Sequence, residues 1–218
     1  MAEKVTFMSE RPSGSVELEG LLSLPDKGGE SPGVVLCHPH PAGGGEMAVG
    51  LLEIMEFRMN KAGLAVLRFN FGGVGRSEGA FTEGFEEPRD VAGAFEFLSS
   101  RSEVDSADVS LSGWSFGAWM CLIALADGLG ARACVAIAPP LMLYDWHSCA
   151  AKVAESPAAR HYIIGANDQF CPVDFLEAFA CEAAGEQEQD IMVMPSTDHY
   201  LMGREDMVAE LVIEDLNK

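Results

Sequence analysis

Short apolar runs alternate with longer segments of helical periodicity along most of this 218-residue chain. The runs at Gly33–Cys37, Leu64–Asn70 and Ala133–Ala138 are largely apolar, without the polar alternation of a half-exposed strand. Between the first two, Met47–Ala62 carries apolar residues at spacings of three and four, which predicts a helix. Strands that are apolar on both faces are typical of a mostly parallel sheet covered by helices on both sides. The alternation therefore predicts an α/β fold.

The same pattern extends to both ends of the chain. Two N-terminal segments, Val5–Met8 and Val16–Leu24, are expected to form antiparallel strands. The remaining elements we expect are strands at Asp108–Leu111, His161–Gly165 and Asp190–Met194, and helices at Pro88–Ser99, Phe116–Ala126, Val173–Ala183 and Glu205–Leu216. Because no internal repeat or Pro/Gly/Ser-rich linker divides the sequence, we expect one domain over residues 1–218.

The charge of the chain argues against anionic partners. It has 34 acidic and 14 basic residues, a formal net charge of −20. Proteins that bind nucleic acids or anionic membranes neutralise phosphates with lysine and arginine patches, so we expect neither partner. We interpret the charge as a solubility feature, with repulsion of anionic ligands or adaptation to a salty cytoplasm as the alternatives.

The sequence also bears on the cellular compartment. No stretch approaches the roughly 18 to 20 apolar residues that cross a bilayer, and the N-terminus does not resemble a secretory signal. Six cysteines occur without CxxC spacing, mostly inside apolar runs, which is typical of buried free thiols. We therefore expect a cytoplasmic protein without a disulfide framework.

The segment "GWSFG" at residues 113–117 directly follows a predicted strand and opens a predicted helix. In open α/β sheets the residues after the carboxyl ends of strands carry the chemistry. Small residues at Gly113 and Gly117 allow a sharp strand-to-helix turn that exposes the hydroxyl of Ser115 above the sheet. The helix start also offers the backbone N–H of Phe116 to an anion. Ser115 is thus a candidate nucleophile.

A serine nucleophile needs an adjacent base that a third group orients. His199 lies in the loop after the last strand and Asp168 in the loop after the strand before it, giving the order serine, acid, histidine. We predict Ser115, Asp168 and His199 as a catalytic triad. Asp145, after the preceding strand, is the alternative acid, and His147 is the alternative base.

The loop "HPHPAGGGEM" after Cys37 could supply N–H donors to a developing oxyanion. Because two of its first five residues are prolines, only His38, His40 and Ala42 can donate there. Metal binding by the two histidines is the rival interpretation, but catalytic zinc normally needs three protein ligands and no partner cluster follows. We expect no metal.

The loop "FGGVGRSEG" after Asn70 resembles a nucleotide-binding loop only superficially. It lacks the lysine of GxxxxGK[ST] and fails the GxGxxG spacing. We interpret it as the rim of a pocket and expect no cofactor.

In combination, "HPHPAGGG", "RFNFGGVGRSEG", "GWSFG", "GANDQFCP" and "TDHY" resemble the α/β-hydrolase superfamily, most closely its small, lidless esterase and dienelactone-hydrolase-like branch. The resemblance covers nearly the whole chain. It implies a roughly eight-stranded, mostly parallel sheet, the triad named above, and an oxyanion hole from the backbone N–H groups of Phe116 and His40. Dienelactone hydrolases typically use a cysteine nucleophile where this chain has Ser115, so their substrate is not implied. Only about twenty residues, Pro139–Ala159, stand where many lipases insert a large lid.

We therefore expect a serine hydrolase that cleaves small carboxylic esters through an acyl-enzyme. A thioesterase, a peptidase, a C–C hydrolase or a non-catalytic ligand-binding protein of this fold are the alternatives. Apolar residues near the serine and in the segment where a lid would stand could line an acyl pocket or simply cover the core. These residues are Trp114, Leu141, Met142, Tyr144 and Trp146. The expected partner is a small-molecule acyl substrate, and the sequence is compatible with a homodimer.

Overall fold

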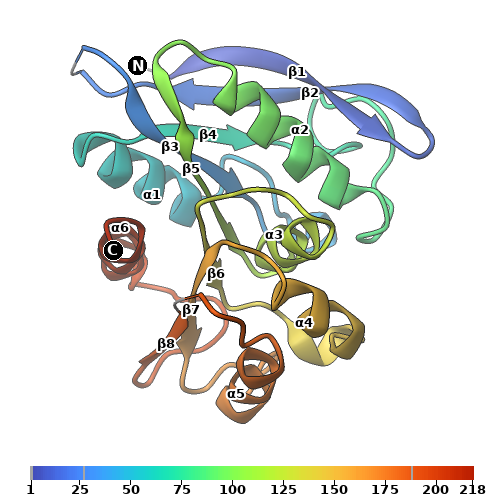
Figure 1. The fold of residues 1–218 in the computed structure, drawn as a ribbon, viewed down its shortest axis with the longest axis vertical. Coiled ribbons are helices and arrows are strands. Elements are labelled where there is room, and N and C mark those ends of the chain that lie inside the picture. Colours follow the sequence, from blue (N-terminus) through green and yellow to red (C-terminus); the bar gives the residue numbers. More distant parts are fainter. Residues whose placement is uncertain (1, 27, 188) are drawn as a thin grey trace.

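One eight-stranded sheet forms the centre of the molecule (Figure 1). The structure is a computed structural model, and it describes residues 2–26, 28–187 and 189–218. The strand order is β1-β2-β4-β3-β5-β6-β7-β8. The strands are β1 (Glu3–Arg11), β2 (Gly14–Ser23), β3 (Ser31–Cys37), β4 (Ala65–Phe69), β5 (Val104–Trp114), β6 (Ala133–Ile137), β7 (Ala159–Gly165) and β8 (Gln189–Met194). The helices are α1 (Gly50–Lys61), α2 (Glu87–Ser99), α3 (Phe116–Ala126), α4 (His147–Val153), α5 (Val173–Glu182) and α6 (Glu205–Leu216), with 3₁₀ turns η1 (Pro41–Gly43) and η2 (Leu141–Leu143).

The sheet is mostly parallel, as the sequence predicts. β1 and β2 form an antiparallel pair, and β2 joins β4 antiparallel. From β4 across β3 to β8 every neighbouring pair is parallel. Parallel neighbours bring the loops after β3, β5, β7 and β8 to the same edge of the sheet. That edge is where the candidate chemistry of the sequence gathers.

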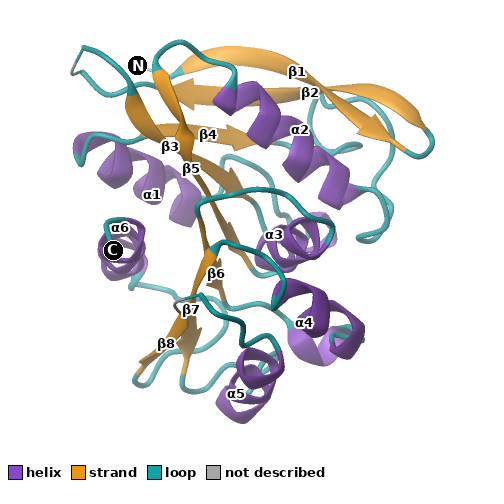
Figure 2. Ribbon diagram, viewed as in Figure 1, coloured by secondary structure: helices purple, strands orange, loops and turns teal. Residues whose placement is uncertain are grey.

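Helices cover both faces of the sheet (Figure 2). Helices α1 and α6 pack together on one face, and α2 to α5 follow one another on the other face. Helix α3 is buried along nearly its whole length because it packs on the sheet between α2 and α4. Its apolar sequence on all sides fits a buried helix. No helix in the described part of the chain is long and apolar enough to span a membrane.

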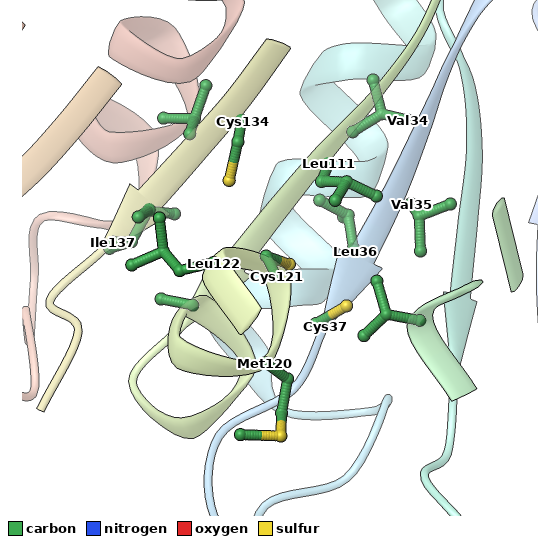
Figure 3. Close-up of a cluster of buried hydrophobic side chains, with 14 of the residues drawn as sticks. Val34, Val35, Leu36, Cys37, Leu111, Met120, Cys121, Leu122, Cys134 and Ile137 are labelled. Atoms are coloured by element: carbon green, nitrogen blue, oxygen red, sulfur yellow. The ribbon is translucent and has the colours of Figure 1, made fainter. Parts of the chain in front are cut away.

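The centre of the core lies where α3 packs on β3, β5 and β6. Figure 3 shows three cysteines in this cluster, Cys37 from β3, Cys121 from α3 and Cys134 from β6. Burial and the neighbouring thiols raise the pKa values of Cys121 and Cys134, so these groups stay protonated. Five of the six cysteines are buried, all six are free, and Cys181 is exposed. The cysteines near the centre are packing residues.

Two predicted elements have different bounds in the structure. Helix α1 begins at Gly50 instead of Met47, because the Met47 N–H donates to Asn70 Oδ1 (2.8 Å) and its carbonyl accepts from Arg68. Strand β5 begins four residues before the expected Asp108, where polar residues hide the strand from a hydrophobicity pattern. Between β6 and β7 lie only η2 and α4, so there is no large lid among the described residues.

Candidate active site

Ser115 stands at a sharp turn between β5 and α3. Its backbone has φ +56° and ψ −118°, an uncommon conformation for a residue with a side chain. A Cβ on Gly113 would lie 2.6 Å from the Ala118 nitrogen, and one on Gly117 would lie 2.7 Å from the His38 carbonyl oxygen and closer still to that of Cys37. Both glycines are therefore required by close backbone contacts, as the strand-to-helix turn predicts.

The structure brings Ser115, His199 and Asp168 together at the carboxyl edge of the sheet. His199 Nε2 lies 2.8 Å from Ser115 Oγ, and His199 Nδ1 lies 2.8 Å from Asp168 Oδ2. The second carboxylate oxygen of Asp168 accepts the N–H groups of Phe170 (2.8 Å) and Cys171 (2.9 Å). Since a carboxylate only accepts, the proton of neutral His199 lies on Nδ1, which leaves Nε2 free to accept from the serine. All three side chains are buried.

The alternative acid and base lie elsewhere. Asp145 lines a separate groove between α3 and α4, beside Trp119 and Cys149. His147 is exposed and pairs with Glu182, at 2.9 Å between Nδ1 and Oε2. Neither residue lines the cavity at Ser115.

A cavity of about 540 Å³ opens above Ser115 and His199. Most of its wall is apolar or aromatic, and no lysine or arginine lines it among the described residues. Its side-chain lining includes Pro39, His40, Val49, Leu51, Trp114, Phe116, Pro140, Leu143, Tyr144, Phe170, Tyr200, Met202 and Glu205. The indole N–H of Trp114 also donates to the backbone carbonyl of His199 (3.2 Å), so this residue joins the serine turn to the histidine loop.

Two of the five predicted pocket residues, Trp114 and Tyr144, line the cavity. Leu141 and Trp146 are instead buried in the core, and Met142 is exposed outside the cavity wall. The prediction was wrong for Leu141 and Met142 because successive side chains of the 3₁₀ turn η2 point in three different directions. In this turn Leu143 faces the cavity and Leu141 faces the core.

Several lining residues were not predicted. Phe170 lies two residues after Asp168, and Tyr200 directly follows His199. Both rings pack edge-on against the His199 imidazole, with ring centroids 4.7 Å away for Phe170 and 5.8 Å away for Tyr200. Closeness to the predicted acid and base was a usable signal for both. Val49 directly precedes α1 and Met202 lies in the turn before α6, and no local pattern marks either residue.

The loop after β3 places His40 in the cavity wall and His38 in the core. The Ala42 N–H is engaged by His40 Nδ1 (3.1 Å). Within the described residues, the backbone N–H groups of His40 and Phe116 donate to no acceptor. Of the three donors that the sequence left open, His40 is thus the one at the cavity with a free N–H.

His38 is held neutral by its surroundings. Its Nδ1 lies 2.7 Å from the Pro39 carbonyl oxygen, and its Nε2 accepts the Phe71 N–H at 3.2 Å. Burial lowers the pKa of His38 to about 4. With both ring nitrogens engaged, His38 cannot join His40 as a metal ligand.

One group with metal-ligand spacing lies far from the cavity. It consists of His161, Asp190 and Asp215, and it is the one such group of three in the part of the chain that the structure describes. The ammonium group of Lys218 pairs with both carboxylates, at 2.7 Å from Asp215 Oδ1. The cluster already has a cation of its own, so nothing here points to a metal.

Comparison with known proteins places the chain in a family. A model of the X-Pro dipeptidyl-peptidase (S15) family matches residues 13–161, more than half of the chain. The chain belongs to this S15 family. The matched region contains the serine turn and the His40 loop, and it ends before Asp168 and His199. S15 membership and the fold make the protein a member of the α/β-hydrolase superfamily, as its motifs predict.

Relatives of this S15 protein cover most of its length. An uncharacterized protein of Rickettsia prowazekii (strain Madrid E) is 27% identical over 78% of this chain and 72% of its own. An α/β serine hydrolase homologue from Coxiella burnetii has 25% identity and a TM-score of 0.81, covering 97% of both chains. A protein of unknown function from Agrobacterium tumefaciens, classed with the α/β hydrolases, has 28% identity and a TM-score of 0.82, covering 99% of this chain and 95% of its own. The S15 protein is thus a serine hydrolase of the α/β fold.

Proposed function

We propose that the protein hydrolyses small carboxylic esters, with Ser115 as nucleophile, His199 as general base and Asp168 as the orienting acid. The observation that carries the proposal is the pair of 2.8 Å contacts that joins the three side chains at the floor of the cavity. In such an arrangement the serine hydroxyl can lose its proton as it attacks a carbonyl carbon.

Each side chain has a defined part in the reaction. His199 Nε2 takes the proton of Ser115 Oγ and returns it to the leaving alcohol, which leaves an acyl-enzyme. Water then attacks the acyl group through the same base and releases the acid. Asp168 holds the imidazole in the required tautomer and stabilises its protonated form. The two N–H groups that Asp168 Oδ1 accepts keep this carboxylate in position.

The backbone N–H groups of Phe116 and His40 are proposed as the oxyanion hole. Both residues line the cavity, and neither amide donates within the described chain. Phe116 is the first residue of α3, so its N–H lies at the positive, N-terminal end of the helix dipole. Preorganised donors at this place stabilise the charge that develops on the carbonyl oxygen.

The cavity favours a small ester with apolar groups. Its wall carries Trp114, Phe116, Tyr144 and Phe170, and its volume is that of a small-molecule site. The described residues of the cavity wall include no lysine or arginine, so in a protein of net charge −20 they offer no counter-charge to a polyanionic thioester such as an acyl-coenzyme A.

A dipeptidyl-peptidase activity is the second candidate, and the S15 match favours it. Glu205 lines the cavity, and its carboxylate is a candidate to hold the ammonium group of a short peptide. Its Oε1 accepts the Gly203 N–H (3.1 Å), and Glu205 has no ion pair among the described residues.

A substrate panel separates these functions. Purified protein is assayed with p-nitrophenyl butyrate, an X-Pro p-nitroanilide and butyryl-coenzyme A, and it is labelled with a fluorophosphonate probe. We expect labelling and fastest turnover of the ester, with both lost in Ser115→Ala. Faster turnover of the anilide would favour the peptidase, and ester turnover that persists in Ser115→Ala would reject the nucleophile. Binding of butyrate without labelling or turnover would indicate a ligand-binding protein.

A further inference from the structure

The side chain of His40 connects two loops at the edge of the cavity. It belongs to the loop after β3, and its Nε2 lies 3.0 Å from Oε2 of Glu83, in the loop between β4 and α2. Its Nδ1 accepts the N–H of Ala42 at 3.1 Å, which closes a turn over Pro41. One imidazole thus fixes its own loop and ties that loop to its neighbour.

The two contacts specify one state of the ring. Because Nδ1 accepts an N–H, it carries no proton, so the proton of a neutral imidazole lies on Nε2. An Nε2–H group can donate to the Glu83 carboxylate, which therefore favours the tautomer that the Ala42 contact needs. A hydrogen bond at one ring nitrogen of a neutral histidine determines whether the other nitrogen is a donor or an acceptor.

Both sides of this contact are held in place. The His40 ring packs edge-on against Phe81 (5.0 Å) and Phe116 (5.2 Å), the residue after the serine. Glu83 has φ +58°, an uncommon value for a residue other than glycine. Its neighbours are fixed by the buried carboxylate of Glu87, which accepts the N–H groups of Thr82 (2.6 Å) and Gly84 (2.7 Å).

We propose that the His40 imidazole, oriented by Glu83, is a positioning group that aims the backbone N–H of His40 at the oxyanion. The inference rests on the proposed function, since it assumes acyl transfer at Ser115. The backbone of His40 has two further constraints, because its carbonyl accepts the N–H groups of Gly43 (3.0 Å) and Gly45 (3.1 Å). These contacts lie within the turn itself, whereas the imidazole ties the turn to the loop between β4 and α2.

Substitutions at His40 separate positioning from substrate contact. In His40→Ala the Ala42 N–H loses its acceptor and the tie to Glu83 is lost. We expect kcat for p-nitrophenyl butyrate to fall at least tenfold while KM stays within twofold, because only the transition state uses the oxyanion hole. In His40→Asn the side-chain oxygen can again accept the N–H two residues on, as in an Asx-turn. We expect this variant to recover at least threefold in kcat over His40→Ala.

A transition-state analogue gives an independent readout. Phenylboronic acid forms a tetrahedral adduct on a nucleophilic serine, and its oxygen occupies the oxyanion position. We expect its inhibition constant to rise at least tenfold in His40→Ala. Inhibition by butyrate, the reaction product, should stay unchanged because butyrate does not resemble the tetrahedral transition state. A rise in KM with kcat unchanged would show that His40 contacts substrate and would overturn the proposal.

Two further sets of variants serve as controls. Glu83 is exposed, so Glu83→Ala should fold even if His40→Ala does not. We expect Glu83→Ala to lower kcat two- to fivefold and Glu83→Gln, which keeps an acceptor oxygen, to restore it. The exposed pair His147–Glu182 is a matched control away from the cavity, and His147→Ala and Glu182→Ala should leave kcat unchanged.

The outcomes for the two proposals are distinct. If wild-type protein turns over the ester and both His40→Ala and Glu83→Ala keep kcat within 1.5-fold (about the precision of such assays), the positioning role is wrong and the proposed function stands. If wild-type protein shows neither ester turnover nor fluorophosphonate labelling, the proposed function fails and the positioning role fails with it.

Discussion

His199 Nε2 lies 2.8 Å from Ser115 Oγ although 84 residues separate the two along the chain. The contact exists because Ser115 follows β5 and His199 follows β8, and both strands end at the same edge of one parallel sheet. Asp168 follows β7, which lies between them in strand order, and it reaches His199 from the side opposite the serine. The strand order therefore gathers the three side chains at one edge of the sheet, and the loops that carry them place His199 between Ser115 and Asp168.

Asp168→Asn should abolish most activity without unfolding the protein. An amide nitrogen cannot accept from His199 Nδ1–H, so the imidazole would turn to the tautomer that cannot accept the serine proton. We expect kcat to fall by about 10³- to 10⁴-fold, with KM nearly unchanged. Ester kinetics and circular dichroism check this, and Asp145→Asn, in its separate groove, is the matched control. Equal losses in both variants would contradict the assignment.

Gly117→Ala should disrupt the serine turn. The new methyl group would meet the carbonyl oxygens of Cys37 and His38, which are backbone atoms at the start of the His40 loop. We expect a loss of about 1–3 kcal/mol in the free energy of unfolding and a large fall in kcat. Gly130→Ala is the control, because nothing lies within 4 Å of its Cβ position and we expect a change under about 1 kcal/mol. Urea unfolding of both variants and the wild type measures these changes in the free energy of unfolding.

His38 should make the protein less stable in mild acid. Burial lowers its pKa from 6.5 to about 4, so between these values the unfolded chain binds a proton that the folded protein does not. The free energy of unfolding therefore falls as the pH falls from about 6.5 to about 4. Only above about pH 6.5 is the protein free of this loss of stability. The difference between these two pKa values corresponds to roughly 3 kcal/mol.

The measurement for His38 is the free energy of unfolding between pH 7 and 4. Wild-type protein is compared with His38→Gln, which lacks the titrating group. We expect the wild-type curve to fall more steeply with decreasing pH than that of the variant. Parallel curves would show that His38 does not carry the effect.

Asp90→Ala should destabilise the fold strongly. The Asp90 carboxylate is fully buried, and it accepts from Arg11 at two nitrogens, from Ser9 Oγ (2.6 Å) and from the Gly72 N–H (2.9 Å). Its removal leaves the buried guanidinium of Arg11 without its main partner. Removing one member of a buried ion pair costs about 3–5 kcal/mol.

A surface ion pair provides the contrast for Asp90. Asp206 lies 3.0 Å from Arg58 in an exposed pair between α6 and α1. We expect Asp206→Ala to cost no more than about 1 kcal/mol, measured by thermal unfolding next to Asp90→Ala. Similar costs for the two variants would mean that burial does not govern these ion pairs.

The sequence by itself determined the layout of the protein. Short apolar runs and helical periodicity are local patterns, and they located the strands and long helices to within a few residues. The two glycines around Ser115 are also a local signal, because the need for a Cβ-free turn arises from the chain on either side. The order of Ser115, Asp168 and His199 then followed from their places after β5, β7 and β8.

Only the tertiary structure decided which side chains meet. Whether Asp168 or Asp145 lies at His199 depends on the directions in which two loops leave the sheet, and each of the two loops carries an aspartate after a strand. Leu143 lines the cavity and Leu141 the core because η2 turns by a third of a revolution at each residue. The link from His40 to Glu83 joins loops 43 residues apart. Such contacts depend on how separate elements pack, and a local pattern carries no information about packing.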